Sequence, residues 1–425
     1  MTTSVSARRR REVLDALRRG TVPHNGLDLL AVGLDRFEAA LDAELESVRT
    51  GGAVFKAVRG EYGSGKTFFS RWLGERAKRL GMAVAEVQVS ETETPLHKLE
   101  TVYRRVCESL ETAEFRPSAF RPVLDAWLFA LESESGAVDT LLEKRLADVS
   151  RTTPAFSSAL RGYRRAQLGG DEATAEGLVA WLGGQPHVAA SIRRSAGVRG
   201  ELDYFGALGF LQGLLIVLRD SGHGGLLLVV DEVETLQRVR TDVREKALNA
   251  LRQLIDDVDA GRFPGMYLLI TGTPAFFDGT QGMQRLPPLA QRLATDFTTD
   301  ARFDNPRAVQ IRLSGFSQEL LQSVGRTVRD LYADGSEAAE RIRTVVDDEY
   351  VLELAAAVSG SLGGKVGVAP RIFLKKLVGD ILDRVDQFPD FNPHQHYKLT
   401  LHATELNDVE RNAAAGTVTV DDIAL

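Results

Sequence analysis

Short apolar runs alternate with longer amphipathic segments along this chain. Residues 53–58, 226–230 and 266–270 are apolar at almost every position, and residues 308–313 form a further, partly apolar run. Runs of this length predict strands that are buried on both faces, as in a parallel sheet. Residues 82–89 carry apolar side chains at alternate positions, which also predicts a strand. The pattern therefore favours an α/β protein with a parallel sheet.

Helical periodicity occupies most of the remaining chain. The predicted helices lie at residues 6–48 with a break near 18–26, and at 68–80, 205–220, 243–258, 317–334, 337–346, 349–358 and 371–385. The last four have no strand pattern between them and predict a separate helical unit. The four expected parts are an N-terminal helical segment over 1–50, an α/β core over 51–315, a helical lid over 316–390 and a tail over 391–425. Within the tail, only residues 416–420 suggest a short strand.

The core contains more chain than its sheet requires. Two strand–helix units take roughly 60 residues, so about 100 of the residues between the second and third predicted strands are additional. This excess is assigned to a largely helical insertion over residues 111–201, which carries 11 Lys and Arg against 12 Asp and Glu. The insertion has no overall basic character, but five of its arginines are clustered. These are Arg161, Arg164, Arg165, Arg193 and Arg194, which form either a solvated face or a contact for DNA or a partner.

A glycine-rich loop follows the first predicted strand and precedes a predicted helix. Its sequence is Gly60-Glu61-Tyr62-Gly63-Ser64-Gly65-Lys66-Thr67, followed by Phe68. A glycine, four residues and Gly-Lys-Thr make the P-loop signature, in which backbone N–H groups and the positive end of a helix surround phosphate groups. In this motif Lys66 reaches the β- and γ-phosphates, and the Thr67 hydroxyl is a ligand for Mg²⁺. The loop predicts a site for ATP with Mg²⁺.

Two adjacent carboxylates end the apolar run at 226–230. They are Asp231 and Glu232, and the carboxyl ends of parallel strands are where such sheets bind their ligands. Asp231 is expected to hold the Mg²⁺ shell, and Glu232 is expected to orient and deprotonate the attacking water. Thr271 follows the next strand and either hydrogen-bonds the γ-phosphate or the attacking water, or caps the helix after Pro274.

Residues farther from the loop complete the predicted site. Val22, Pro23 and Gly33 are candidates for adenine contacts, with an ordinary helix–loop–helix connection as the alternative. Arg292, with Arg285 as the second choice, is a candidate arginine finger that acts on a neighbouring subunit. Its alternative is a surface arginine on a helix.

The lid contributes one further candidate. Arg371 opens the last long lid helix and is expected to sense the γ-phosphate, unless it is a surface arginine in the first turn. Gly363, Gly364 and Gly367 precede it and would let the lid hinge, and Lys365 is expected to be solvated.

Composition narrows the class of protein further. The chain has 425 residues, a net charge of −7 and a single cysteine, Cys107, so it cannot form an internal disulfide. Its arginine-rich N-terminus lacks the apolar core of a signal peptide, and no apolar stretch is long enough to cross a bilayer. We therefore expect a cytoplasmic protein without a membrane association.

These motifs, in this order, resemble the AAA+ branch of P-loop ATPases, and are similar to its origin-recognition group. More narrowly, residues 16–23, 59–68 and 363–371 resemble the BrxD family of ATP-binding proteins of the bacterial BREX phage-defence system. The start Arg59-Gly60-Glu61-Tyr62-Gly63 is more distinctive than a bare P-loop. The resemblance implies an ASCE/AAA+ fold, a role in defence, and a partner such as a helicase. The long insertion departs from a plain AAA+ pattern.

Two hypotheses of function follow. In the first, the chain is an ATPase that oligomerises and couples ATP turnover to assembly or remodelling on duplex DNA. In the second, it is a nucleotide-gated scaffold with slow turnover that recruits a helicase or another defence protein. Glu232 favours the first hypothesis, because a protein that only binds ATP does not need this carboxylate. A kinase is a distant third possibility, since no acceptor-substrate signature is visible.

Overall fold

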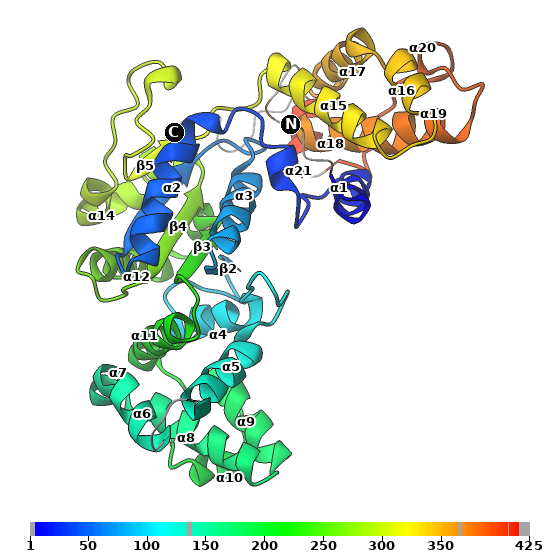
Figure 1. The fold of residues 1–425 in the computed structure, drawn as a ribbon. Coiled ribbons are helices and arrows are strands. Elements are labelled where there is room, and N and C mark those ends of the chain that lie inside the picture. Colours follow the sequence, from blue (N-terminus) through cyan, green and yellow to red (C-terminus); the bar gives the residue numbers. More distant parts are fainter. Residues whose placement is uncertain (1–4, 134–137, 364–366, 368, 407, 416–425) are drawn as a thin grey trace.

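A five-stranded parallel sheet forms the centre of the protein (Figure 1). The computed structural model describes residues 5–133, 138–363, 367, 369–406 and 408–415. The strands lie in the order β2-β3-β4-β1-β5. Their bounds are β1 Val54–Arg59, β2 Ala83–Gln88, β3 Leu226–Asp231, β4 Met266–Gly272 and β5 Gln310–Arg312. All five predicted strands are confirmed, although β5 is shorter than predicted.

The two faces of the sheet are covered by different helices. Along β3, Leu226, Leu228 and Val230 point to one core, whereas Leu227 and Val229 point to the other, as the two-residue period of a strand requires. The larger core contains side chains of α4, α11 and α12, and the smaller contains those of α2 and α3. The helices that belong to the core are α2 Asp35–Arg49, α3 Lys66–Arg79, α4 Leu99–Ser109, α11 Tyr204–Asp220, α12 Thr241–Asp259, α13 Pro274–Asp278 and α14 Pro287–Arg292.

The predicted insertion is a group of helices between α4 and α11, at the end of the molecule opposite the lid (Figure 1). Its helices are α5 Phe120–Ser133, α6 Val138–Arg145, α7 Ala147–Thr152, α8 Pro154–Leu168, α9 Glu172–Leu182 and α10 Ala190–Ser195. Phe210 of α11 packs edge-on against Phe156 and Trp181 at 5.0 and 5.3 Å between ring centroids. At Gly213, one turn along α11, an added Cβ would lie 2.4 Å from the Phe156 ring. The insertion therefore shares its apolar core with the sheet.

The C-terminal part of the chain forms a helical unit, as predicted. Its helices are α15 Gln318–Ala333, α16 Ala339–Val345, α17 Asp348–Ser361, α18 Pro370–Lys375 and α19 Asp383–Gln387, with a π-helical segment Lys376–Leu382 joining the last two. The tail adds α20 Pro393–His396 and α21 Asp408–Ala414. The strand suggested at 416–420, and Gly364 and Lys365, lie outside the described residues.

The first 50 residues divide between two units. Helix α1, Ala7–Arg19, buries Val13, Leu14 and Leu17 in the core of the lid, whereas α2 packs on the sheet. Arg18 of α1 also pairs with Asp383 of α19, with its Nε 2.6 Å from Oδ2. Periodicity predicted both helices but not that the lid core would contain α1. Short 3₁₀ turns lie at Leu27–Leu29, Val233–Gln237, Met283–Arg285 and Ala301–Phe303.

Candidate functional site

The glycine-rich loop connects the carboxyl end of β1, which lies between β4 and β5, to helix α3, so the predicted strand–loop–helix order is confirmed. Gly63 and Gly65 have φ angles of 81° and 91°, a backbone conformation that favours glycine. At Gly60 an added Cβ would lie 2.3 Å from the Ser64 hydroxyl. Ser64 Oγ is buried and has no hydrogen-bond partner among the described residues. The loop is therefore a close-packed turn with a donor left for a ligand.

Lys66 lies in the first turn of α3 and is folded back onto its own loop. Its ammonium donates to the carbonyl oxygens of Gly60, at 2.8 Å, and Glu61, at 3.3 Å. It also lies 5.1 Å from the centre of the Tyr62 ring. Burial lowers the pKa of Lys66, and the charge of Glu234 is the largest opposing influence. A phosphate group would offer this buried cation stronger acceptors than two carbonyl oxygens do.

Thr67 and Asp231 meet where β1 and β3 end. The Thr67 hydroxyl is 3.3 Å from Asp231 Oδ2. The hydroxyl of Thr271, which is fully buried, donates to Asp231 Oδ1. A hydroxyl and a carboxylate at this spacing suit Mg²⁺, which prefers hard oxygen ligands and keeps several waters. The donors present therefore fit the Mg²⁺ site that the sequence predicts.

Glu232 leaves the strand in a left-handed conformation, with φ of 61°. Its backbone N–H donates to Asp231 Oδ1 at 3.1 Å and to the Thr271 hydroxyl at 3.3 Å. Its side chain accepts a hydrogen bond of 2.8 Å from Gln88 Nε2 at the end of β2. The strained turn places Glu232 beside the P-loop, and Gln88 holds its carboxylate. Gln88 was missed by the sequence analysis, because only the strand order brings β2 beside β3.

A second buried carboxylate, Glu234, lies behind Lys66. Its Oε1 is 3.9 Å from Lys66 Nζ, and the residue is 5% exposed. Neither of its carboxylate oxygens has a hydrogen-bond partner among the described residues. Burial raises the pKa of Glu234, while Lys66 opposes this shift. The signal for this residue was the acidic spacing Asp-Glu-Val-Glu after β3, of which the sequence analysis used only the first two positions.

These groups open into one cavity of about 580 Å³ between the core and the lid. The P-loop from Tyr62 to Phe68 forms its floor, together with Asp231 and Glu232. Its other walls come from three parts of the chain: the loop after α1 with Val22, Pro23 and Gly33, the segment with Leu313 and Phe316, and the lid with Pro370 and Arg371. The structure therefore brings the predicted adenine-contact residues to the same cavity as the predicted phosphate site.

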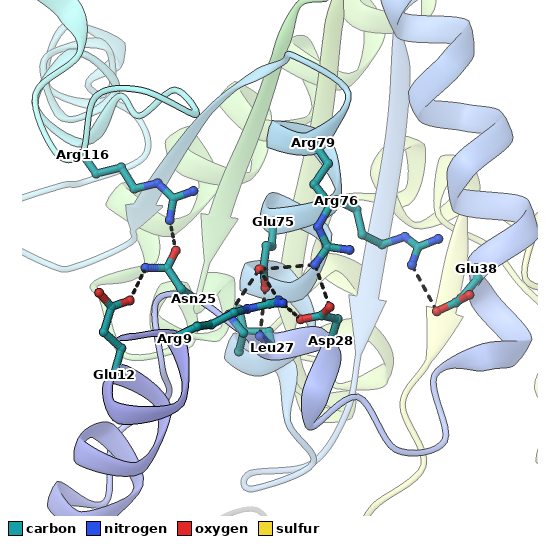
Figure 2. A network of polar contacts seen from close by, with 11 residues as sticks. Arg9, Glu12, Asn25, Leu27, Asp28, Glu38, Glu75, Arg76, Arg79 and Arg116 are labelled. Carbon is teal, nitrogen blue, oxygen red and sulfur yellow. Dashed lines mark hydrogen bonds and ion pairs between the residues drawn. The ribbon is translucent and has the colours of Figure 1, made fainter. Parts of the chain in front are cut away.

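A polar network anchors the loop after α1, which lines the cavity (Figure 2). Glu75 of α3 is buried and accepts hydrogen bonds from the backbone N–H groups of Leu27, at 2.8 Å, and Gly26, at 3.2 Å. Arg9 of α1 and Arg79 of α3 reach the same carboxylate at 3.2 and 3.3 Å. Burial alone would raise the pKa of Glu75. The two N–H groups and the two guanidinium groups outweigh this effect, so the pKa lies below its ordinary value. The loop is thus fixed to the helix that begins at the P-loop.

The two predicted distant arginines occupy different environments. Arg371, at the start of α18, lines the cavity, but its Nε donates to Glu410 of α21 at 2.8 Å. Arg292, at the end of α14, is not among the residues that line the cavity; it pairs with Asp256 of α12 and donates to the Pro288 carbonyl at 2.8 Å. Arg285 lies 3.4 Å from Glu245. A role of Arg292 in a neighbouring site stays a prediction.

The clustered arginines of the insertion mostly have partners within the chain. Arg161 pairs with Glu143, and Arg164 Nε lies 3.1 Å from Glu132. Arg193 and Arg194 donate to backbone carbonyl oxygens. These contacts favour the interpretation of a structural, solvated face over a dedicated phosphate contact.

The sheet order, the P-loop after β1, the Asp231–Glu232 pair at the end of β3 and the helical lid define an AAA+ P-loop nucleotide-binding protein. The chain belongs to the family described as BREX system ATP-binding protein BrxC/D, whose model matches residues 5–401. This family covers both BrxC and BrxD, and the predicted resemblance to it is confirmed.

Other comparisons add little. No curated protein matches the chain. Among solved structures, the chain is similar to the ORC2 protein of Aeropyrum pernix, described as ADPNP–ADP complexes. The two share 12% sequence identity with a TM-score of 0.36, over 82% of this chain and 68% of that one. A similarity at this level carries no conclusion about this protein. Among the described residues, no helix is long and apolar enough to cross a membrane.

Proposed function

We propose that this protein binds ATP with Mg²⁺ in the cavity between core and lid and hydrolyses it. The arrangement of Thr67 and Asp231, 3.3 Å apart beside Lys66 and Glu232, carries this proposal. Lys66 and Thr67 begin α3 directly after the P-loop, and Asp231 and Glu232 lie at the end of β3, which β4 separates from β1. The four residues meet at the carboxyl edge of the sheet, where a phosphate chain would lie across the P-loop. The family description of an ATP-binding protein supports the same nucleotide.

Each residue has a distinct task in the proposed reaction. The P-loop N–H groups and Lys66 bind the phosphates, and Thr67 and Asp231 hold Mg²⁺, which neutralises phosphate charge when bound. Glu232 orients the attacking water and takes its proton. Thr271 holds Asp231 through its hydroxyl, and Arg371 responds to the γ-phosphate from the lid. Arg292 completes the site of a neighbouring subunit in an oligomer.

In a cell, we propose that turnover drives assembly or remodelling on duplex DNA within a BREX-type defence system. The family description supports the system, and it implies other components of that system as partners. We propose a helicase as one of them. The helical insertion, at the end of the molecule opposite the lid, is available for such a partner (Figure 1).

The nucleotide-gated scaffold remains the second candidate, and one contact favours it. Gln88 donates to Glu232 at 2.8 Å, which keeps the proposed catalytic carboxylate occupied. If this contact persists with ATP bound, turnover is slow and nucleotide acts as a switch. Gln88→Ala should then raise basal ATP turnover several-fold, because the Glu232 carboxylate loses the hydrogen bond that competes with its contact to water. A fall in turnover would show instead that Gln88 assists the reaction.

Nucleotide binding is the first test of the proposal. Lys66→Ala should weaken the affinity for Mg²⁺–ATP by roughly 30-fold or more, because a charge-assisted contact to two phosphates is lost. Calorimetric titration measures this affinity, and Lys98→Ala, at an exposed lysine, is the matched control. Equal affinity in the two variants would place the ATP site elsewhere.

A further inference from the structure

The tail beyond α20 packs against lid helix α18 and the π-helical segment that follows it. Leu406 and Ala413 are buried in the lid core. The Glu405 carboxylate lies 2.9 Å from Lys376 Nζ and 3.3 Å from Lys375 Nζ. Burial raises the pKa of Glu405, but Lys376, the N–H of His402 and Lys375 lower it to about 2. Residues 405–406 and 408–414, here called the tail clamp, are therefore attached to the lid by both apolar and ionic contacts.

The tail clamp places a carboxylate in the wall of the nucleotide cavity. Glu410 is 1% exposed and lines the cavity together with Val409. It accepts hydrogen bonds from Nε of Arg371, at 2.8 Å, and from Nη2 of the same side chain. Nη2 also donates to the carbonyl oxygen of Glu405 at 2.5 Å. The charge of Arg371 is thus neutralised by the chain itself.

We propose that Glu410 is a specificity-determining residue of the nucleotide cavity, because it takes the place at Arg371 that the γ-phosphate of ATP would take. The inference rests on the proposed function of the cavity. A carboxylate and a phosphate group compete for one guanidinium, since both bind it through paired N–H donors. ADP lacks the γ-phosphate and has no need of Arg371.

The competition has a consequence for the tail. When ATP is bound, Glu410 loses its hydrogen bonds from Arg371 while it lies buried beside a polyphosphate, which is unfavourable for a carboxylate. Release of the tail clamp relieves this cost and uncovers Leu406 and Ala413 on the lid. The tail clamp thus lowers the preference of the cavity for ATP over ADP and reports which nucleotide is bound.

The test compares two nucleotides on the full chain. Affinities for Mg²⁺–ADP and for a non-hydrolysable ATP analogue with Mg²⁺ are measured by calorimetry for the natural protein and for Glu410→Gln. The variant should bind the ATP analogue roughly fivefold tighter or more, the usual lower range of coupling between two sites. Its affinity for ADP should change by less than about twofold. Glu353→Gln, at an exposed glutamate of α17, should change neither affinity.

A second variant excludes a general effect on folding. In an Arg371→Ala background, Glu410→Gln should leave the ratio of the two affinities unchanged, because the competition has lost its target. Thermal unfolding of each variant without nucleotide shows whether the lid still folds. A lower affinity of Glu410→Gln for the ATP analogue would show that Glu410 positions Arg371. An equal change in the affinities for both nucleotides would show that Glu410 only supports the tail. Either result would overturn the inference while the proposed ATP site remained. If the natural protein bound neither nucleotide, the proposed function would fail, and the inference with it.

Discussion

The residues around Lys66 show how the charge of this buried lysine is stabilised. Two carbonyl oxygens of its own loop accept its N–H bonds, and Glu234 lies 3.9 Å away. Burying a cation without such partners is costly. Nucleotide binding would therefore exchange these carbonyl acceptors of Lys66 for phosphate oxygens.

The buried carboxyl group of Glu234 makes a prediction about stability. Its pKa is raised by burial, and such a group destabilises the folded state once the pH rises above its unfolded pKa, near about 4.3. Glu234→Gln should therefore raise the melting temperature of the nucleotide-free protein at pH 8, and this gain should shrink as the pH falls toward about 5. Calorimetry at both pH values measures it, with Glu353→Gln as the control. A variant that melts lower at both pH values would show that the native carboxylate is stabilising.

Local motifs made part of the site predictable. The P-loop and the Asp231–Glu232 pair each act within a few consecutive residues, so the sequence contains the whole signal. Gln88 and Glu410 act through neighbours from other elements, and no local pattern marks them. Glu234 was marked only by the acidic spacing Asp-Glu-Val-Glu, and its contact with Lys66 of α3 depends on the fold. Arg371 was predicted from its place at a helix start, but the carboxylate that pairs with it lies 39 residues further along the chain.

At the scale of elements, α1 and the loop after it connect the lid to the core. Helix α1 belongs to the lid core by packing, whereas its Arg9 reaches Glu75 of α3. Asn25 in the following loop accepts a hydrogen bond from Arg116, at the start of the insertion, and donates to Glu12 at 3.0 Å (Figure 2). Periodicity predicted these helices. It could not predict contacts such as that of Arg9 with Glu75, because the two residues are far apart in the sequence and meet only in the folded chain. Lid, P-loop helix and insertion therefore meet at one network.

The network predicts unequal costs for two similar changes. Glu75→Ala should lower the free energy of unfolding by about 2 kcal/mol or more, because it leaves two buried backbone N–H groups without their acceptor. It also leaves Arg9 and Arg79 with Asp28 alone, where they now contact two carboxylates. Glu38→Ala removes an acidic partner of Arg76 on the same side of the core, at 3.1 Å, but the Glu38 side chain is 41% exposed. Its cost should be below about 1 kcal/mol.

Chemical denaturation of both variants gives the comparison. The Glu75 contribution should be present at neutral pH and be lost in acid, because the pKa of this carboxyl group is lowered in the folded protein. Equal effects of the two substitutions would mean that the network does not connect α1 to the core.

At the scale of the whole molecule, an AAA+ core carries two additions: a lid that closes one side of the cavity, and a helical insertion at the opposite end (Figure 1). The insertion shares the sheet's apolar core, so it is positioned firmly enough to present a surface to a partner. The insertion was predictable from the length of chain between the second and third strands. Its packing on α11 through Phe156 and Trp181 was not predictable, because an aromatic residue in a helix does not indicate which other helix it contacts.

Oligomerisation gives a prediction at this scale. Arg292→Ala should leave the affinity for ATP nearly unchanged but lower turnover at high protein concentration by on the order of 10³-fold, as expected for a lost arginine finger. Arg285→Ala should have a smaller effect. ATP turnover and ATP affinity, measured on the same samples, show whether Arg292 acts in the reaction or only in binding. Full, concentration-dependent activity in Arg292→Ala would exclude this residue as the finger and leave its pairing with Asp256 as its role.

The most direct test of ATP hydrolysis is the steady-state turnover of Mg²⁺–ATP, measured against protein concentration with and without duplex DNA, for the natural protein and Glu232→Gln. The proposed function predicts turnover that rises with concentration and with DNA and falls by at least about 10²-fold in the variant, the usual contribution of a general base. Tight ATP binding with negligible turnover in every condition would contradict it and establish a nucleotide-gated scaffold.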